Sequence, residues 1–265
     1  ERDVYKVNQT LYRVTPTVNW SRGKDFEVLF GVGVQYSQEE DENSFIDVLR
    51  PYGWGDFGQL NVITALEWDS RGIKRGGVQA MMAGEAPPAG AKSKKRYTGL
   101  RLMAGGQYSP KAFDVEDPFG AVQGSVSGYL GLGSTERVVL AARVGGRQTF
   151  GTYPWYAAAF IGGGDSNRGF REQRFAGDKS FYGNFELRLR AIDMMPVIPG
   201  RLWLFGLADF GRVWLEGEDS DDWHPSYGGG IAFEVAGSPL AFWTGVAKGQ
   251  GEDGVRFYFL SGFGF

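Results

Sequence analysis

The sequence predicts an all-β fold, a closed antiparallel transmembrane β-barrel of about twelve strands with a long loop folded into its lumen. Three observations predict it. Glycine supplies 42 of the 265 residues and aromatic residues 15%, while cysteine is absent. Segments in which apolar and polar residues alternate recur between turn-like breaks. The chain ends in alternating aromatic residues up to Phe265, and no linker divides it, so we expect residues 1–265 to form a single barrel domain.

The alternation is clearest in residues 180–191. One face of this predicted strand carries Phe181, Phe185, Leu187, Leu189 and Ala191, and the other carries Tyr182, Asn184, Glu186, Arg188 and Arg190. Such a strand separates a polar interior from an apolar exterior, which favours a membrane barrel. A soluble sheet that buries the apolar face under a second layer is the alternative. Because only alternate residues of a membrane barrel face lipid, the mean hydropathy of -0.27 is compatible with one.

Twelve segments have this character, at the usual spacing of about ten residues for such strands. They are residues 4–19, 25–37, 57–69, 76–86, 96–109, 121–132, 137–149, 180–191, 201–215, 226–236, 240–248 and 255–265. An even number of strands would place both termini on the periplasmic side. Residues 202–210 are largely apolar on both faces. We expect this strand to pack against the inserted loop, and a buried strand of a soluble sheet is the alternative.

The inserted loop is expected at about residues 152–179, between the seventh and eighth predicted strands, and it contains Arg168-Gly169-Phe170. Further motifs follow in order: Asn184-Phe185-Glu186-Leu187-Arg188, Asp209-Phe210-Gly211-Arg212-Val213-Trp214 and Ser226-Tyr227-Gly228-Gly229-Gly230. Together they resemble the BamA/TamA-type outer-membrane protein assembly superfamily, the bacterial surface antigen barrels. As in that superfamily, five predicted strands run from the loop to the C-terminus. Asp69-Ser70-Arg71 is similar, more weakly, to the superfamily's Asp-Thr-Arg hairpin.

This resemblance implies a barrel that assists the insertion or translocation of proteins at the outer membrane, through a weak seam between its first and last strands. Typical members have POTRA modules and more barrel strands. The present sequence starts directly on a predicted strand and resembles a short member without POTRA modules. Two other functions therefore stay open: a plugged structural barrel that anchors a larger envelope complex, and a passive pore.

An arginine carried into a barrel lumen needs carboxylate partners, and its planar guanidinium suits paired hydrogen bonds. Glu186 and Asp209 lie on neighbouring predicted strands, so we expect them to anchor the loop through Arg168. Gly169 would allow the backbone to approach the wall closely, and Phe170 would pack beside it. The alternative is that Arg168 is a solvated loop residue and that the two carboxylates line water.

The last predicted strand places Phe257, Phe259, Phe263 and Phe265 on one face. Phe259, Phe263 and the terminal Phe265 resemble the C-terminal signal by which outer-membrane barrels are recognised for insertion. An ordinary edge strand is the alternative. In a soluble protein, however, a flat aromatic edge would invite aggregation unless it were paired, for example with the first strand of a closed barrel.

We expect an integral protein of the bacterial outer membrane that contacts its lipids and lipopolysaccharide, together with client or other envelope proteins. The net charge of -3 argues against a nucleic-acid partner. We expect neither enzyme activity nor a cofactor or metal site. His224, the only histidine, is interpreted as a turn residue. The acidic residues 216–222 are interpreted as a solvated loop, with divalent-cation binding as the weaker alternative.

Overall fold

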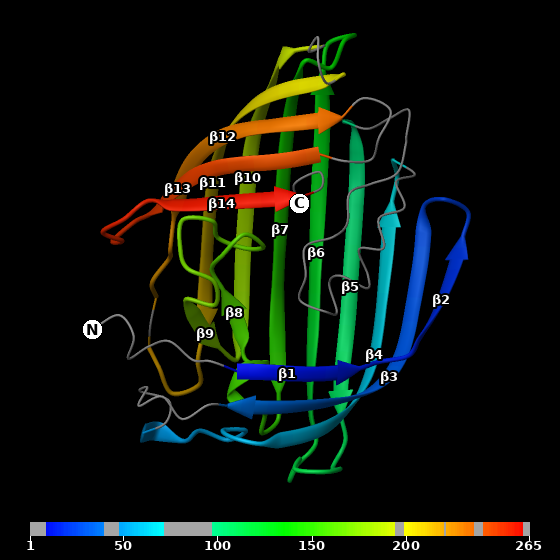
Figure 1. Ribbon diagram of the computed structural model, residues 1–265, viewed down its shortest axis with the longest axis vertical. Helices are drawn as coiled ribbons and strands as arrows, with labels where there is room; N and C mark the ends of the chain where they lie inside the picture. Colours follow the sequence, from blue (N-terminus) through cyan, green and yellow to red (C-terminus); the bar gives the residue numbers. More distant parts are fainter. Residues whose placement is uncertain are drawn as a thin grey trace.

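The computed structural model describes residues 9–39, 48–71, 97–193, 199–219, 221–235 and 241–261. Twelve strands form one large antiparallel sheet, and two short strands form a second (Figure 1). The large sheet contains β1 (Gln9–Val14), β2 (Thr17–Arg22), β3 (Phe26–Glu39), β4 (Phe57–Asp69), β5 (Gly99–Ser109), β6 (Phe119–Leu132), β7 (Val138–Phe150), β10 (Lys179–Ile192), β11 (Gly200–Trp214), β12 (Ser226–Val235), β13 (Ala241–Gly249) and β14 (Arg256–Ser261). The small sheet contains β8 (Ala159–Ile161) and β9 (Phe175–Gly177), which follow the 3₁₀ turn η2 (Trp155–Ala157).

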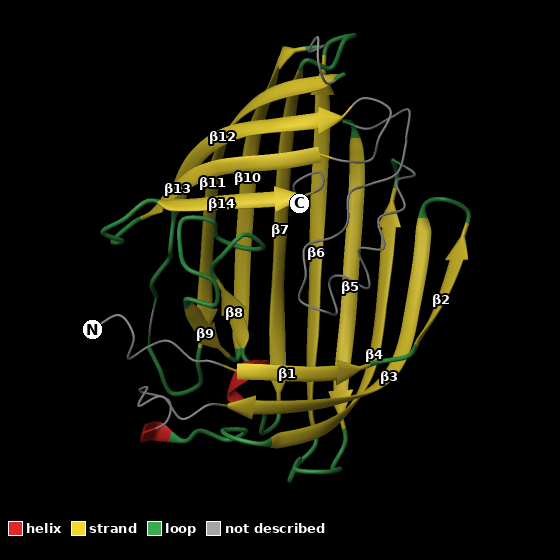
Figure 2. Cartoon of the chain, viewed as in Figure 1, coloured by secondary structure: helices red, strands yellow, loops and turns green. Residues whose placement is uncertain are grey.

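The large sheet is a curled wall around the segment that carries β8 and β9. Its strand order is β1-β3-β4-β5-β6-β7-β10-β11-β12-β13-β14, with β2 also paired to β3. Figure 2 shows that strands dominate the chain and that helical turns are short. Among the residues that the structure describes, no helix has the length and apolarity needed to cross a membrane. The all-β antiparallel architecture is confirmed. Closure of the barrel stays a prediction, because β1 and β14 are the two edges of the described sheet and lie apart in Figure 1.

At the N-terminal edge of the sheet, two short strands occupy the position of one. β1 and β2 pair with successive parts of β3 in one register, since Val14 lies opposite Val34 and Thr17 lies opposite Gly31. Pro16, which has no N–H to donate, separates them. The two strands fill a single position, so eleven strands lead from β1 to β14 in the order above.

With eleven antiparallel positions, β1 and β14 run in the same direction, as their arrows show in Figure 1. The placement of both termini on the periplasmic side stays a prediction, because residues 1–8 and 262–265 lie outside the described residues. The strand predicted at residues 76–86 lies outside the described residues. In the described sheet β4 and β5 pair directly with each other, from Val62↔Tyr108 to Asp69↔Arg101.

The wall is apolar outside and polar inside. In β3 the side chains of Phe30, Val32 and Val34 are exposed, whereas Gln35 and Ser37 are buried on the inner face. The same reversal occurs along β10. There Phe185, Leu187 and Leu189 are exposed, and Asn184, Glu186 and Arg188 are buried. The two faces predicted for residues 180–191 are those observed in these six positions. A sheet that buries amides and charges while exposing leucine and phenylalanine inverts the pattern of a soluble protein.

The inner face of β11 is an exception to the polar lumen. Trp203 and Phe205 are buried there, with ring centroids 5.1 Å from Tyr97 and 5.2 Å from Trp243, respectively. Leu204 is 46% exposed on the opposite face, so this part of β11 is apolar on both sides. The expectation that this strand packs against the inserted loop is met only at the far end of the stretch. Its inner face packs against neighbouring strands and the residue that precedes β5, and the loop meets β11 further along, at Asp209.

Candidate functional site

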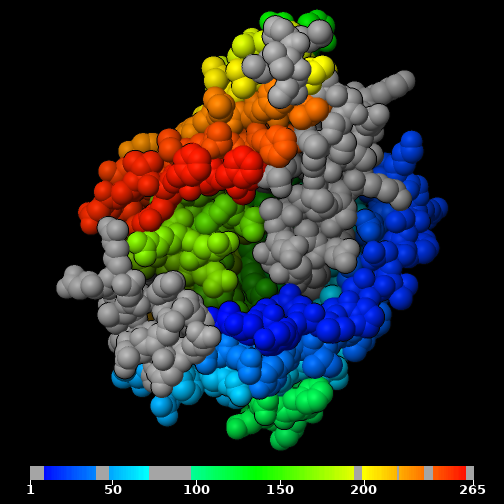
Figure 3. Space-filling model, in the orientation of Figure 1, coloured from blue at the N-terminus to red at the C-terminus, as the bar shows by residue number. Residues whose placement is uncertain are grey.

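The segment between β7 and β10 folds into the curl of the sheet, where β8 and β9 contact β7, β10 and β11. Figure 3 shows it in green inside the opening between β14 and β1. The segment is held together by the short ladder Ala159↔Gly177 to Ile161↔Phe175 and by the bridge Gly163↔Asn167. We call residues 152–179, the range expected from the sequence, the inward loop; it contains η2, β8 and β9.

Arg168, at the tip of the inward loop, lies between the two predicted carboxylates. Its Nε donates to Oδ2 of Asp209 at 2.8 Å, and its Nη2 donates to Oδ1 of the same residue at 2.6 Å. Its Nη1 donates to Glu186. The backbone N–H of Arg168 also donates to Asp209, at 3.0 Å. All three residues are buried, with exposed fractions of 5%, 2% and 1% for Arg168, Asp209 and Glu186. The alternative of a solvated Arg168 is therefore excluded.

A second arginine, Arg188, completes the charge balance of this cluster. Its Nε and Nη2 lie 2.7 and 2.6 Å from Oε2 of Glu186, and its guanidinium sits 4.5 Å from the ring centre of Trp243. Two guanidinium groups and two carboxylates thus neutralise one another away from water, which limits the cost of burying them. Arg188 is not among the site residues predicted from the sequence. Its signal was the spacing of two residues from Glu186, which puts both side chains on one face of a strand.

Asn184 links the charge cluster to the loop backbone. Its Nδ2 donates to the carbonyl of Ser166 at 2.7 Å and to Oδ1 of Asp209 at 2.9 Å. Its Oδ1 accepts from Nε of Arg143 at 2.9 Å. The amide therefore uses both its donor and acceptor sides while buried, and it fixes the loop against β7 and β11 as well as β10. Asn184 lies on the polar face predicted for its strand, but the pattern does not predict these contacts.

Gly169 brings the loop backbone against β12 and β13. Its N–H donates to Oγ of Ser226 at 3.2 Å, and its carbonyl accepts from the N–H of Gly249 at 3.1 Å. A Cβ at this position would lie 2.3 Å from Cβ of Ser226 and 2.6 Å from the backbone nitrogen of Gly249. Only glycine fits this approach, as expected from the sequence. Phe170 is 3% exposed, and its ring lies against Gly249 and Phe175.

Replacing Gly169 with alanine is expected to cost about 1–3 kcal/mol of unfolding free energy, because backbone atoms of β13 block the added methyl group. Denaturant unfolding and the rate of proteolysis within residues 152–179 measure the effect. Gly254→Ala is the matched control, since a Cβ there meets nothing within 4 Å. Equal stability of the two variants would show that the loop does not need this close approach.

His224 precedes β12 and contacts the inward loop. Its ring stacks on Phe175 with centroids 3.6 Å apart, and its carbonyl accepts from Nδ2 of Asn167 at 2.6 Å. Burial lowers the pKa of His224.

For Arg168, burial alone would lower the pKa, but Glu186 and Asp209 outweigh it and raise that pKa overall. The loop arginine is therefore charged at neutral pH, as a guanidinium ordinarily is.

Asp69 and Arg71 form a second buried ion pair, at the end of β4. The guanidinium donates from Nε and Nη2 to the two oxygens of Asp69, at 2.9 and 2.7 Å, and lies 3.7 Å from the ring centre of Tyr129. This ion pair explains why the Asp69-Ser70-Arg71 motif needs both charged residues, because the arginine side chain folds back onto the aspartate two residues earlier. The contact with Tyr129, which lies on β6, is not predicted by the motif.

The remaining predicted site residues belong to the C-terminal strand. Phe257 and Phe259 are 75% and 61% exposed on the outer face of β14. Phe263 and Phe265 lie outside the described residues, and the insertion signal stays a prediction. In the part of the chain that the structure describes, no three His, Cys, Asp or Glu side chains gather as a metal site would require. The described residues of the acidic segment 216–222 are exposed.

A wall that is apolar outside and polar inside, curled around an arginine-anchored loop, is typical of membrane β-barrels. Among solved structures, the chain is similar to "The crystal structure of BamA from Haemophilus ducreyi lacking POTRA domains 1-3", with a TM-score of 0.64 and 16% sequence identity. The match covers 97% of this chain and 55% of that chain, so this chain spans about half the length of that structure. Neither a protein-family model nor a curated protein sequence matches the chain. The chain has a BamA-type barrel fold, which confirms the predicted resemblance at the level of fold.

Proposed function

We propose that the chain is an outer-membrane barrel protein that assists the insertion or translocation of proteins at the outer membrane. The observation that carries this proposal is the likeness in fold to BamA over 97% of the chain. The motifs around Arg168, Glu186 and Asp209 support it independently, because they resemble those of the BamA/TamA-type superfamily in residue type and in order along the chain. Client proteins and other envelope proteins are the proposed partners.

The outer surface supports a place in the lipid bilayer. Large apolar side chains are exposed on strands from β3 to β14, including Phe30, Leu187, Ile231 and Phe259. In water this surface would drive aggregation, whereas lipid is a solvent in which apolar side chains are stable. Trp223 packs at 6.1 Å from Phe181 and 5.8 Å from Phe210, as centroid distances. These rings form an aromatic cluster of the kind found where such barrels meet the membrane surface.

The edges of the sheet support a role with other polypeptides. β1 and β14 are unpaired with each other in the described chain, and an unpaired strand edge is a template for a further strand. β14 contributes exposed Phe257 and Phe259 to this edge. A client strand that pairs there would bury its own backbone groups while it passes into lipid, where unpaired groups are costly.

Depletion of the protein from its source bacterium, followed by measurement of the outer-membrane proteome, tests the proposal. We expect several barrel proteins to fall in abundance and to recover when the wild-type protein or the surface variant Arg137→Ala is supplied. Arg168→Ala, which releases the inward loop, should fail to restore them. An outer-membrane proteome unaltered by depletion would overturn the assembly role.

A plugged barrel that anchors an envelope complex is the second candidate, and the buried loop network favours it. Arg168, Asn184 and Gly169 attach the loop to β10, β11, β12 and β13, so the plug is part of the wall's own structure. Purification in mild detergent distinguishes the two candidates. A stoichiometric partner protein together with an unaltered proteome supports the anchor.

A further inference from the structure

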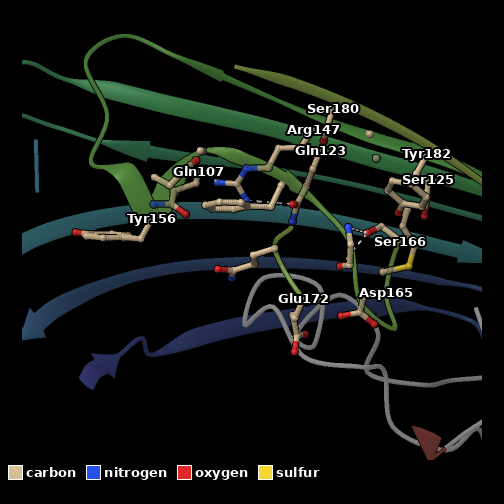
Figure 4. Close-up of a pocket in the computed structure, with 18 of the residues that line it drawn as sticks. Gln107, Gln123, Ser125, Arg147, Tyr156, Asp165, Ser166, Glu172, Ser180 and Tyr182 are labelled. Carbon is tan, nitrogen blue, oxygen red and sulfur yellow. Dashed lines mark hydrogen bonds between the residues drawn. The ribbon is translucent and has the colours of Figure 1, made fainter. Parts of the chain in front are cut away.

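A polar cavity of about 460 Å³ lies between the inward loop and the inner face of the sheet (Figure 4). Six glutamines line it. Its charged lining residues are Arg13, Arg101, Arg143 and Arg147 on the strands and Asp165 and Glu172 on the loop. Figure 4 shows Arg147 and Gln123 on the strand side and Asp165 and Glu172 across the cavity on the loop. The volume is sufficient for a small solute with several waters.

Arg147, on β7, is held in this cavity by weak neutral contacts. It lies directly opposite Gln123 of β6, and its Nη1 donates to Oε1 of that residue at 3.3 Å. Its Nη2 donates to the carbonyl of Ala157 in the loop, also at 3.3 Å. Its Nε is shielded from solvent and has no hydrogen-bond partner in the part of the chain that the structure describes. A guanidinium with five N–H donors is thus left with two long bonds.

Three other arginines inside the curl of the sheet have carboxylate partners. Arg101 is paired with Glu67 at 2.7 Å, Arg188 with Glu186, and Arg168 with Glu186 and Asp209. Arg147 forms no ion pair with any described residue. Arg13, on the edge strand β1, lines the same cavity and carries a charge of the same sign. Arg147 is therefore a cation whose position needs a counter-charge that the described wall does not provide.

We propose that this cavity binds a small oxyanion, of the phosphate or carboxylate class, with Arg147 as its principal ligand. The anion would accept hydrogen bonds from the guanidinium and offset the repulsion between Arg147 and Arg13. Gln123, opposite Arg147 in the sheet, is the neutral side chain placed to assist. Planar paired recognition of such anions is the chemistry to which arginine is best suited. This site does not depend on the function proposed above, because it rests on the lumen alone.

Binding of inorganic phosphate and of acetate to the purified protein in detergent tests the proposal. Titration calorimetry in a chloride buffer of matched ionic strength gives the affinity for each anion. We expect Arg147→Gln to weaken binding of the preferred anion by at least about tenfold, the loss of a charge-assisted hydrogen bond. Arg137→Gln, at a surface pair with Asp193 whose arginine side chain is 56% exposed, should bind as the wild type does. The preferred anion assigns the class.

The stability of the same variants gives a second readout that a merely structural role would not produce. In chloride, Arg147→Gln should be as stable as the wild type or more so, because it removes a charge that has no counter-charge among the described residues. Adding the preferred anion should raise the unfolding temperature of the wild type but not that of Arg147→Gln. Arg147→Lys keeps the charge without the planar fork and should bind with intermediate affinity.

Three results would overturn the proposal. One is binding of neither anion to the wild type. Another is equal binding by the wild type and Arg147→Gln, which would place the anion away from Arg147. The third is a loss of stability in chloride for both Arg147→Gln and Arg147→Lys, which would make Arg147 a structural residue satisfied by its neutral contacts.

Discussion

Replacing Arg168 with alanine is expected to cost about 3–5 kcal/mol of unfolding free energy, a large fraction of the stability of most domains. The change leaves the carboxylates of Glu186 and Asp209 buried, with exposed fractions of 1% and 2%. Arg188 still faces Glu186, but Asp209 loses its guanidinium partner. Denaturant unfolding of the protein in detergent measures the loss. The inward loop should also become sensitive to protease.

Arg137→Ala is the control for this prediction. Arg137 pairs with Asp193, but the two side chains are 56% and 43% exposed, so the pair should contribute only about 0–1 kcal/mol. Converting the cluster to a neutral one, with Arg168→Met, Glu186→Gln and Asp209→Asn together, should recover part of the stability that Arg168→Ala loses. If Arg168→Ala and Arg137→Ala lose equally little, the arginine cluster does not anchor the loop.

Replacing Leu187 with arginine is expected to cost about 2–4 kcal/mol in a lipid bilayer, because the residue lies midway along β10 on its outer face. The chain supplies a matched control in Leu215, which follows the end of β11. Leu187 and Leu215 are 39% and 40% exposed, so a soluble protein would tolerate arginine equally at both. In a membrane only the first variant puts a charge into the apolar layer. Unfolding in vesicles measures the difference, and equal stability of the two variants would contradict a lipid-facing outer wall.

The fold class could be predicted because its signal is local and repetitive. A period of two along β10 fixes which side chains share a face, and no tertiary information is needed to see that Leu187 and Glu186 point to opposite sides. The contact of Arg168 with Glu186 and Asp209 was also predictable. A buried guanidinium must find carboxylates, and few lie on neighbouring strands after the loop. The close approach of Gly169 to the wall was predictable as well, because glycine has no side chain to prevent it.

Other features depend on how the sheet curls, which the sequence pattern does not encode. Tyr97 precedes β5 yet donates to Glu234 of β12 at 2.6 Å, across 137 positions of sequence. This contact helps to explain why the inner face of β11 is apolar at Trp203, where a polar lumen was expected. The number of strand positions could not be predicted either. The alternation continues through Pro16 and does not reveal that β1 and β2 share one position in the sheet. A sequence also does not show that Arg101 has a carboxylate partner whereas Arg147 has none among the described residues.

The most direct test of the central claim, an apolar outer wall around a polar lumen in a membrane, is a spin-label scan of β3. The chain contains no cysteine, so each label can be attached to a single introduced one. Val32 and Val34 are exposed on the outer face, and Gln35 and Ser37 are buried on the inner face. In bilayers we predict that labels at Val32 and Val34 collide with lipid-soluble oxygen. Labels at Gln35 and Ser37 should be shielded from it. Equal oxygen accessibility at all four positions, or the reverse alternation, would contradict the account.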